Sequence, residues 1–239
     1  MTGVHSFLIR TDASHKIGTG HVLRTLSLAN SLKSYGQVHF ACLETHGNLC
    51  YMIEDQGFGV HRLNYSSTQI LWKDDIAQTK EICLKIKPQW VIVDHYGLDY
   101  RWERELKNFC DFLLVIDDLA DRKHCCDMLL DQSLGRQADA YSKLIPTICK
   151  MLLGAEYALL RSQFEINQEK ILKKRIQSIA RFKVLISIGG LDEANLILPI
   201  LKFIEDTTEF RDLEIFVVLF SQTKNLSAIK HFVQHSELD

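Results

Sequence analysis

Apolar runs of strand length alternate with amphipathic segments along most of the chain. The runs are β-branched and nearly continuous in apolar character, which is typical of parallel strands buried on both faces. The segments between them carry apolar residues at helical spacing, as Val22, Leu26 and Ala29 do. This alternation predicts an α/β fold made of βαβ units around a parallel sheet. The expected strands are residues 6–11, 37–43, 60–63, 90–94, 112–117, 128–130 and 151–153, and the expected helices are residues 21–34, 48–56, 74–86 and 100–109.

A polar, lysine-rich stretch at residues 165–181 interrupts the pattern, which then restarts with two more strands and two more helices. We expect a Rossmann-like domain over residues 1–155, a linker or helix over 156–181, and a partial second Rossmann-like domain over 182–239. A two-stranded parallel sheet makes a poor core by itself, so either this half packs on the first or the chain is short relative to a longer parent. The expected elements of the second half are strands 182–188 and 213–219 and helices 195–205 and 226–234.

Composition narrows the class of ligand. The chain has 239 residues, 46% of them apolar, and a formal net charge of −2, so charge gives no case for nucleic acid or an anionic membrane as a partner. It has no signal-peptide pattern and no apolar run near the roughly 18 residues that a membrane helix needs. Its seven cysteines show no C-x-x-C spacing. We therefore expect a cytoplasmic protein with reduced thiols and a small-molecule ligand, and the oligomeric state stays open.

Polar, titratable residues follow three of the predicted strands. The first strand leads into Asp12, the fourth into Asp94 and His95, and the fifth into Asp117 and Asp118. In open parallel sheets, ligands bind beyond the carboxyl ends of the strands. These groups are therefore expected to share one crevice.

The first of these loops contains Gly18-Thr19-Gly20-His21, directly before a predicted helix. Glycines allow close approach of a ligand to the backbone, and a helix N-terminus suits a phosphate or a developing anion. A neutral histidine there could serve as a general base, although an ordinary helix-end histidine is the alternative. The loop lacks the third glycine of the dinucleotide fingerprint, so a nicotinamide cofactor is not favoured.

A metal site is a second interpretation of the carboxylates and of His95, because these residue types bind divalent ions. The spacing of known metal motifs is missing. The other interpretation is that the carboxylates cap helices or orient the histidines. The sequence favours the latter, so neither a metal nor a cofactor is expected.

Four segments of the chain together form a recognisable pattern: residues 10–24, 91–97, 114–118 and 153–164. They resemble the UDP-sugar hydrolases of pseudaminic acid biosynthesis and the spore-coat polysaccharide proteins related to them. The first segment is fairly specific and the combination of the four is much more so. The resemblance covers nearly the whole chain in order.

The resemblance implies a GT-B-like architecture of two Rossmann-like domains. It implies inverting hydrolysis of the bond between the anomeric carbon and the UDP oxygen, with His21 as the catalytic residue and Arg161 in contact with substrate. Either Asp12 or Asp94 would orient the imidazole of His21. The residues that the resemblance places along the substrate pocket are Asp12, Gly18, Gly20, Arg24, Asp94, His95, Tyr96, Arg161, Gly189 and Gly190.

The chain also departs from the family pattern. Leu191 follows Gly189 and Gly190 where the family has a small, often hydroxylated residue. The later strand–helix units, which carry the main uridine- and diphosphate-binding residues in the family, are missing, so the chain resembles a C-terminally truncated member. Two alternatives stay open: a GT-B glycosyltransferase that uses a UDP-sugar donor, and a non-catalytic sugar-binding fragment.

Overall fold

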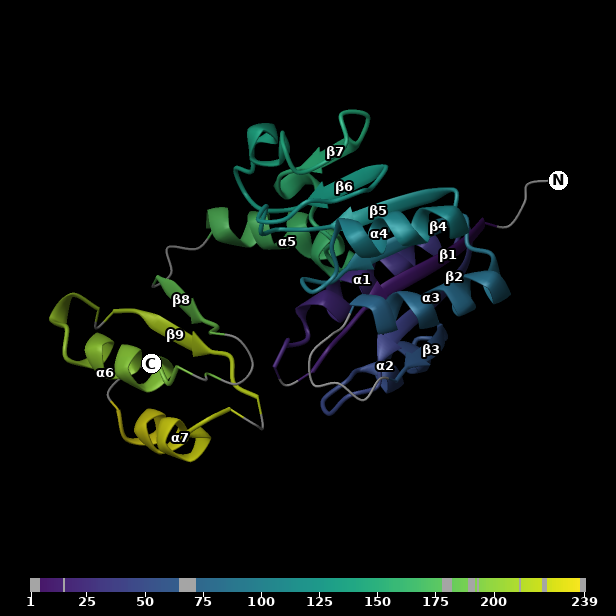
Figure 1. The fold of residues 1–239 in the computed structure, drawn as a ribbon. Coiled ribbons are helices and arrows are strands. Elements are labelled where there is room, and N and C mark those ends of the chain that lie inside the picture. Colours follow the sequence, from purple (N-terminus) through teal and green to yellow (C-terminus); the bar gives the residue numbers. More distant parts are fainter. Residues whose placement is uncertain are drawn as a thin grey trace. The chain divides into compact units, whose positions relative to one another are not determined.

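The computed structural model describes residues 5–14, 16–64, 72–177, 182–188, 192, 194–210, 212–220 and 223–236 (Figure 1). Contacts within the chain divide it into two units, Met1–Ile166 and Asn167–Asp239. The division falls inside helix α5 (Ser162–Gln177), within the stretch expected to hold a linker or helix. The domain boundaries expected at residues 155 and 181 stay predictions.

The first unit is built on a seven-stranded parallel sheet with the order β3-β2-β1-β4-β5-β6-β7. All seven strands were expected from the sequence, and their ends differ from the expected ones by at most one residue. The strands are β1 (His5–Thr11), β2 (Gly36–Leu43), β3 (Gly59–Leu63), β4 (Trp90–Asp94), β5 (Phe112–Ile116), β6 (Met128–Asp131) and β7 (Lys150–Leu153).

Helices cover both faces of this sheet, and alternate strand residues point to opposite faces. Leu8 of β1 lies in the core cluster that contains Trp102 of helix α4 (Tyr100–Leu106). The next residue, Ile9, lies in the cluster that contains Leu26 of helix α1 (Gly20–Leu32). Throughout the described ranges, no helix is both long and apolar enough to cross a membrane. The helices are α1 (Gly20–Leu32), α2 (Cys50–Asp55), α3 (Trp72–Ile86) and α4 (Tyr100–Leu106), with short 3-10 turns η1 (Lys107–Phe109), η2 (Ala138–Tyr141) and η3 (Ala155–Tyr157).

The direction in which successive strands are added to the sheet reverses between β1 and β4. After β2 and β3 extend it on one side of β1, the chain crosses back and β4 pairs with the other side of β1. At this junction Thr11, the last residue of β1, is in register with Asp94, the last residue of β4. Ligands of open α/β sheets bind beyond the carboxyl ends of the strands at such a switch point.

The second unit contains a parallel pair, β8 (Lys183–Ile186) and β9 (Glu214–Val217), with helices α6 (Ile197–Glu205) and α7 (Leu226–His235) and the 3-10 turn η4 (Thr208–Phe210). Its core gathers Ile186, Ile197, Leu201, Ile204 and Ile229. All four main elements were expected, and they are shorter or shifted at their ends. The strand–helix–strand–helix order is that of a Rossmann-like unit.

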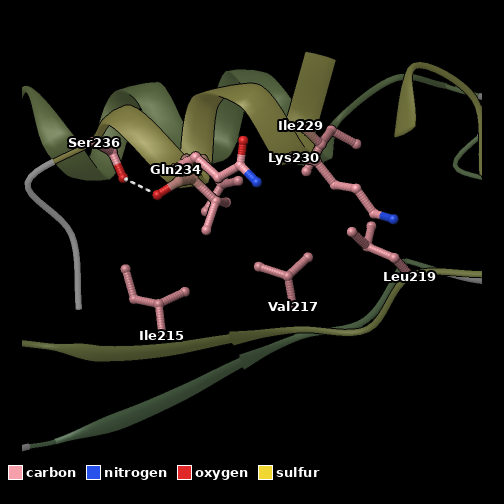
Figure 2. A pocket seen from close by; sticks show the side chains of 9 residues that line it. Ile215, Val217, Leu219, Ile229, Lys230, Gln234 and Ser236 are labelled. Carbon is pink, nitrogen blue, oxygen red and sulfur yellow. Dashed lines mark hydrogen bonds between the residues drawn. The ribbon is translucent and has the colours of Figure 1, made fainter. Parts of the chain in front are cut away.

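A hollow of about 490 Å³ lies between β9 and α7 in the second unit (Figure 2). Ile215 and Val217 point from the strand toward the helix, and Ile229 faces them from α7. Lys230 and Gln234 are the longer polar side chains along the lining. The lining is mostly apolar, so the hollow resembles an incompletely filled core more than a site for a charged nucleotide.

Candidate active site at the switch point of the first unit

The loop after β1 folds back on itself before α1 begins. The amide of Gly18 donates to the carbonyl of Ser14 (2.8 Å), and the amide of Ile17 donates to the Ser14 hydroxyl (3.0 Å). Gly18 has φ +83°, a conformation that a residue with a side chain adopts only with strain. A Cβ added at Gly18 or at Gly20 would meet no atom within 4 Å, so both glycines border open space.

His21 lies in the first turn of α1 and is only 6% exposed. Its Nδ1 is 2.6 Å from Oδ1 of Asp94, which is fully buried at the end of β4. A carboxylate accepts a hydrogen bond, so this contact places the proton of a neutral imidazole on Nδ1 and leaves Nε2 as the basic nitrogen. The sequence left Asp12 and Asp94 as alternatives for orienting the imidazole. The contact is made by Asp94.

Arg24 lies about one helical turn after His21, and its guanidinium donates hydrogen bonds to two carboxylates. Its Nε and one terminal nitrogen each lie 2.6 Å from an oxygen of Asp94, and the other terminal nitrogen lies 2.7 Å from Asp118. Burial disfavours the charge, but the hydrogen bonds to both carboxylates outweigh it and raise the pKa of Arg24. Arg24 therefore acts here as a bridge between Asp94 and Asp118, and its predicted contact with substrate stays a prediction.

Tyr96 forms the exposed side of the same cluster. Its hydroxyl donates to Oδ1 of Asp118 (2.7 Å), and its ring meets the His21 ring edge-on at 4.5 Å between centroids. Burial and the hydrogen bond to Asp118 raise the pKa of Tyr96 to about 12, so the phenol stays protonated and remains a donor at neutral pH. At 43% exposure, Tyr96 is the member of the cluster most open to a ligand.

Asp12 lies behind this cluster and is only 1% exposed. It pairs with the buried guanidinium of Arg10, accepts the amide of Leu43 (2.7 Å), and lies 3.2 Å from Nε2 of His95. Burial opposes the charge, but Arg10 and His95 hold the pKa of Asp12 well below its usual range. The structure thus places Asp12 in a buried network with Arg10 and His95. Its contact with substrate stays a prediction.

A second buried network surrounds Asp117, at the end of β5. Oδ2 of Asp117 accepts from the Tyr141 hydroxyl (2.9 Å), and Oδ1 lies 2.7 Å from Arg122. His124 lies between this carboxylate, at 3.8 Å, and Glu103, at 2.7 Å. Burial alone would lower the pKa of His124, but the two carboxylates together raise it to about 9. Sequence reasoning missed this network, because Glu103, His124 and Tyr141 stand in no recognisable spacing.

Arg122 ties the loop after β4 to the loop after β5. Besides pairing with Asp117, its side chain donates to the carbonyl of Leu98 (3.2 Å) and to that of His95 (3.4 Å). Its guanidinium also lies over the ring of Tyr96, 5.9 Å from the centroid. These contacts hold the two loops that carry Tyr96 and Asp118 in one arrangement.

Arg161 follows the last strand of the first unit and is exposed. Its guanidinium lies over the ring of Phe164, 5.7 Å from the centroid. Two residues earlier, the amide of Leu159 donates to Oε1 of Gln132, directly after β6 (2.9 Å). The segment that leads to Arg161 is therefore attached at the carboxyl edge of the sheet. The contact of Arg161 with substrate stays a prediction.

The turn predicted to contact the nucleotide in the second unit, Gly189, Gly190 and Leu191, lies outside the described residues. The next residue, Asp192, is 3% exposed, and its carboxylate accepts the amides of Leu196 (2.8 Å) and of the next residue (3.3 Å). Asp192 thus accepts hydrogen bonds from two amides at the beginning of α6.

The carboxylates considered as metal ligands are engaged with cations and hydroxyls. Asp94 is held by His21 and Arg24, and Asp118 by Arg24 and Tyr96. Among the residues that the structure describes, no three His, Cys, Asp or Glu side chains are gathered as they would be around a metal ion. The arrangement of the carboxylates fits the orienting role that the sequence favoured.

Two curated proteins align with the chain, whereas no known family profile matches it. The chain is 31% identical over 193 residues to UDP-2,4-diacetamido-2,4,6-trideoxy-beta-L-altropyranose hydrolase of Campylobacter jejuni, covering 81% of this chain and 63% of the hydrolase. It is 27% identical over 221 residues to protein MJ1062 of Methanocaldococcus jannaschii, covering 88% of this chain and 42% of that protein. The chain therefore spans less than two thirds of the length of either relative.

Solved structures agree with the fold. MurG of Acinetobacter baumannii superposes with a TM-score of 0.62 at 12% identity, covering 98% of this chain and 65% of MurG. The UDP-N-acetylglucosamine 2-epimerase of Rickettsia bellii superposes with a TM-score of 0.55 at 11% identity, covering 99% of this chain and 68% of the epimerase. With the parallel sheet, these similarities confirm the α/β, GT-B-like fold class. Over the region that aligns, the chain is similar in sequence to the UDP-2,4-diacetamido-2,4,6-trideoxy-beta-L-altropyranose hydrolase of Campylobacter jejuni.

Proposed function

We propose that the protein hydrolyses a UDP-activated 2,4-diacetamido-2,4,6-trideoxy sugar at its anomeric carbon, with inversion, and releases UDP. The observation that carries the proposal is the His21–Asp94 pair at the switch point of the sheet, 2.6 Å apart. The alignment with the hydrolase of Campylobacter jejuni supports the choice of substrate class. A place in pseudaminic acid biosynthesis and a location in the cytoplasm belong to the same proposal.

In the proposed mechanism, Nε2 of His21 accepts a proton from the water that attacks the anomeric carbon. A bond forms between the water oxygen and that carbon, and the bond between the carbon and the diphosphate oxygen breaks. UDP leaves with the bonding electrons. Asp94 keeps the proton of the neutral imidazole on Nδ1 and stabilises the imidazolium that forms. Since the diphosphate is a good leaving group, no strong general acid is needed.

The open space beside Gly18 and Gly20 is the proposed position of the sugar. A Cβ at either glycine would point into this space without touching the protein. The beginning of α1 has no acidic residue in its first turn and no side-chain cap at Thr19, so its amides can support the polar groups of a ligand. The ring of Tyr96, whose hydroxyl is held by Asp118, would contact the sugar from the exposed side. Arg161, Gly189 and Gly190 are proposed contacts of the remainder of the substrate.

The test compares UDP release from the altrose-type UDP-sugar by the unsubstituted chain, called the parent from here on, and by the variant H21N. Asparagine keeps the polarity and approximate size but cannot act as the base, so the rate should fall by about 10²- to 10⁴-fold. Anomeric configuration, read by NMR of the first-formed sugar, checks inversion. Release by H21N at the parent rate would refute the role of His21, and transfer of the sugar to an acceptor with little free sugar would indicate a glycosyltransferase.

A further inference from the structure

We propose that Asp118 is a positioning residue for His21, acting through Arg24 and Tyr96; the catalytic part of this inference rests on the proposed role of His21 as the base. Asp118 does not touch His21. One oxygen of its carboxylate accepts a hydrogen bond from Arg24, and the other accepts a hydrogen bond from Tyr96. Through these two residues it restrains the imidazole.

The first connection runs through the guanidinium of Arg24. Oδ2 of Asp118 accepts from one terminal nitrogen of Arg24 (2.7 Å), while the rest of the guanidinium grips both oxygens of Asp94. The guanidinium is planar and its donors are fixed in direction, so anchoring one end sets the orientation of the other. The position of Asp94, and with it the hydrogen bond to Nδ1 of His21, therefore depends on Asp118.

The second connection runs through Tyr96. Oδ1 of Asp118 accepts from the Tyr96 hydroxyl (2.7 Å), and the ring of Tyr96 lies 4.5 Å from that of His21 at an interplanar angle of 82°. Edge-to-face packing restricts rotation of the imidazole, and the hydrogen bond restricts the tyrosine ring. The two connections close a ring of contacts that begins and ends at His21.

Asp118 is itself held in place. Arg136 donates to its backbone carbonyl (2.7 Å), and the preceding residue, Asp117, is fixed by Tyr141 and Arg122. The Asp118 side chain keeps 24% of its surface exposed, compared with 12% for Arg24. Its oxygens are thus aimed at two donors by a rigid backbone, which is the requirement for a residue that orients others.

Replacing Asp118 with asparagine tests the proposal. An amide has one accepting oxygen and no charge, so Arg24 loses its ion pair with residue 118, and the two donors, Arg24 and Tyr96, no longer each find an accepting oxygen in its present position. In D118N we expect kcat for UDP release to fall about 10- to 100-fold, as when a partner that orients a histidine is lost, while KM changes less than about twofold. D111N is the matched control, because Asp111 is exposed directly before β5, at the opposite end of the same strand.

A double-mutant cycle separates positioning from substrate contact. Y96F removes the hydroxyl and keeps the ring. If Tyr96 acts through Asp118, the double variant D118N/Y96F should lose no more than about twofold beyond D118N alone. Independent contacts of the two residues with substrate would instead make the losses multiply and would raise KM, which would overturn the proposal.

Nitrogen NMR of the full chain with ¹⁵N-labelled histidine gives a readout that needs no substrate. The His21 signals are identified by their loss in H21Q. In the parent they should show one tautomer with the proton on Nδ1, and in D118N they should move toward each other as the tautomers mix. Unchanged His21 signals in folded D118N overturn the positioning role. A parent without UDP release, but with the NMR change, would reject the proposed hydrolase function and leave the positioning of the imidazole intact.

Discussion

His21 and Asp94 are 73 residues apart in the chain, yet Nδ1 of the one lies 2.6 Å from Oδ1 of the other. They meet because β4 pairs with β1, which ends just before the loop that leads to His21. The pair combines a ring nitrogen fixed by a buried carboxylate with a second nitrogen free to accept a proton, the arrangement found in histidine bases generally.

Changing Asp94 to asparagine should reverse the tautomer of His21. The amide can donate to Nδ1, which moves the proton to Nε2 and removes the base. We expect kcat for UDP release to fall by about 10²- to 10⁴-fold. D55N, at an exposed aspartate of α2, is the control and should match the parent. A D94N rate within about threefold of the parent would show that Asp94 does not orient the base.

The buried ion pairs of Arg10 lead to a prediction about stability that can be tested without measuring activity. Arg10 is fully buried, and Asp75 and Asp12 balance its charge, while Asp75 also accepts from Nε1 of Trp102 (2.8 Å). D75A leaves the guanidinium with one partner, so urea unfolding should show a loss of about 3–5 kcal/mol. D74A changes the exposed neighbour and should cost less than about 0.5 kcal/mol. Equal losses in the two variants would contradict the role assigned to the buried pair.

Because of His124, we expect the free energy of unfolding to fall as the solution becomes alkaline. Its pKa in the folded protein is raised to about 9 from 6.5, so its contribution is complete below about pH 6.5 and is lost as pH rises through about 9. The contribution is on the order of 3 kcal/mol. Urea unfolding of the parent and of H124Q should differ most near pH 6 and converge toward pH 9.5. H231Q, at an exposed histidine of α7, should keep the pH dependence of the parent, and a difference between parent and H124Q that does not change with pH would reject this assignment.

The two glycines of the loop should respond differently to alanine. G18A forces a side chain into φ +83° and should lower the free energy of unfolding by about 1–2 kcal/mol. G20A meets no atom and has no such strain, so its stability should stay near that of the parent. Its methyl group, however, enters the space proposed for the sugar, so KM for the UDP-sugar should rise. A G20A variant with lowered stability and unchanged KM would contradict this position of the sugar.

The strands and the catalytic edge could be predicted from the sequence because both follow from local patterns. Continuous apolar runs mark buried parallel strands, and the residue after each run marks the carboxyl edge. Helix ends were less accurate because side chains in the preceding loop decide them. Asn48 accepts the amide of Cys50 (3.1 Å), and α2 begins at Cys50 instead of residue 48. Asp192 likewise accepts the amides of residues 196 and 197, and α6 begins at residue 197 instead of 195.

Which side chain contacts which could not be predicted from the sequence. Asp12 and Asp94 were equal candidates to orient His21, since both end strands that lie beside each other. Asp94 takes this role because Asp12 already forms a buried ion pair with Arg10. Pairs such as His124 and Glu103 depend on the packing of loops against helices, and no spacing in the chain records that packing.

The order of strands across the sheet also bears on how the site forms during folding. His21 and the loop before it belong to the first βα unit, but their carboxylate partner arrives only when β4 adds to β1 on the side away from β2. This pairing closes a loop of many tens of residues, and contacts of long sequence separation form late and slowly. The geometry by which His21 can accept a proton therefore depends on the central pairing of the sheet, between β1 and β4.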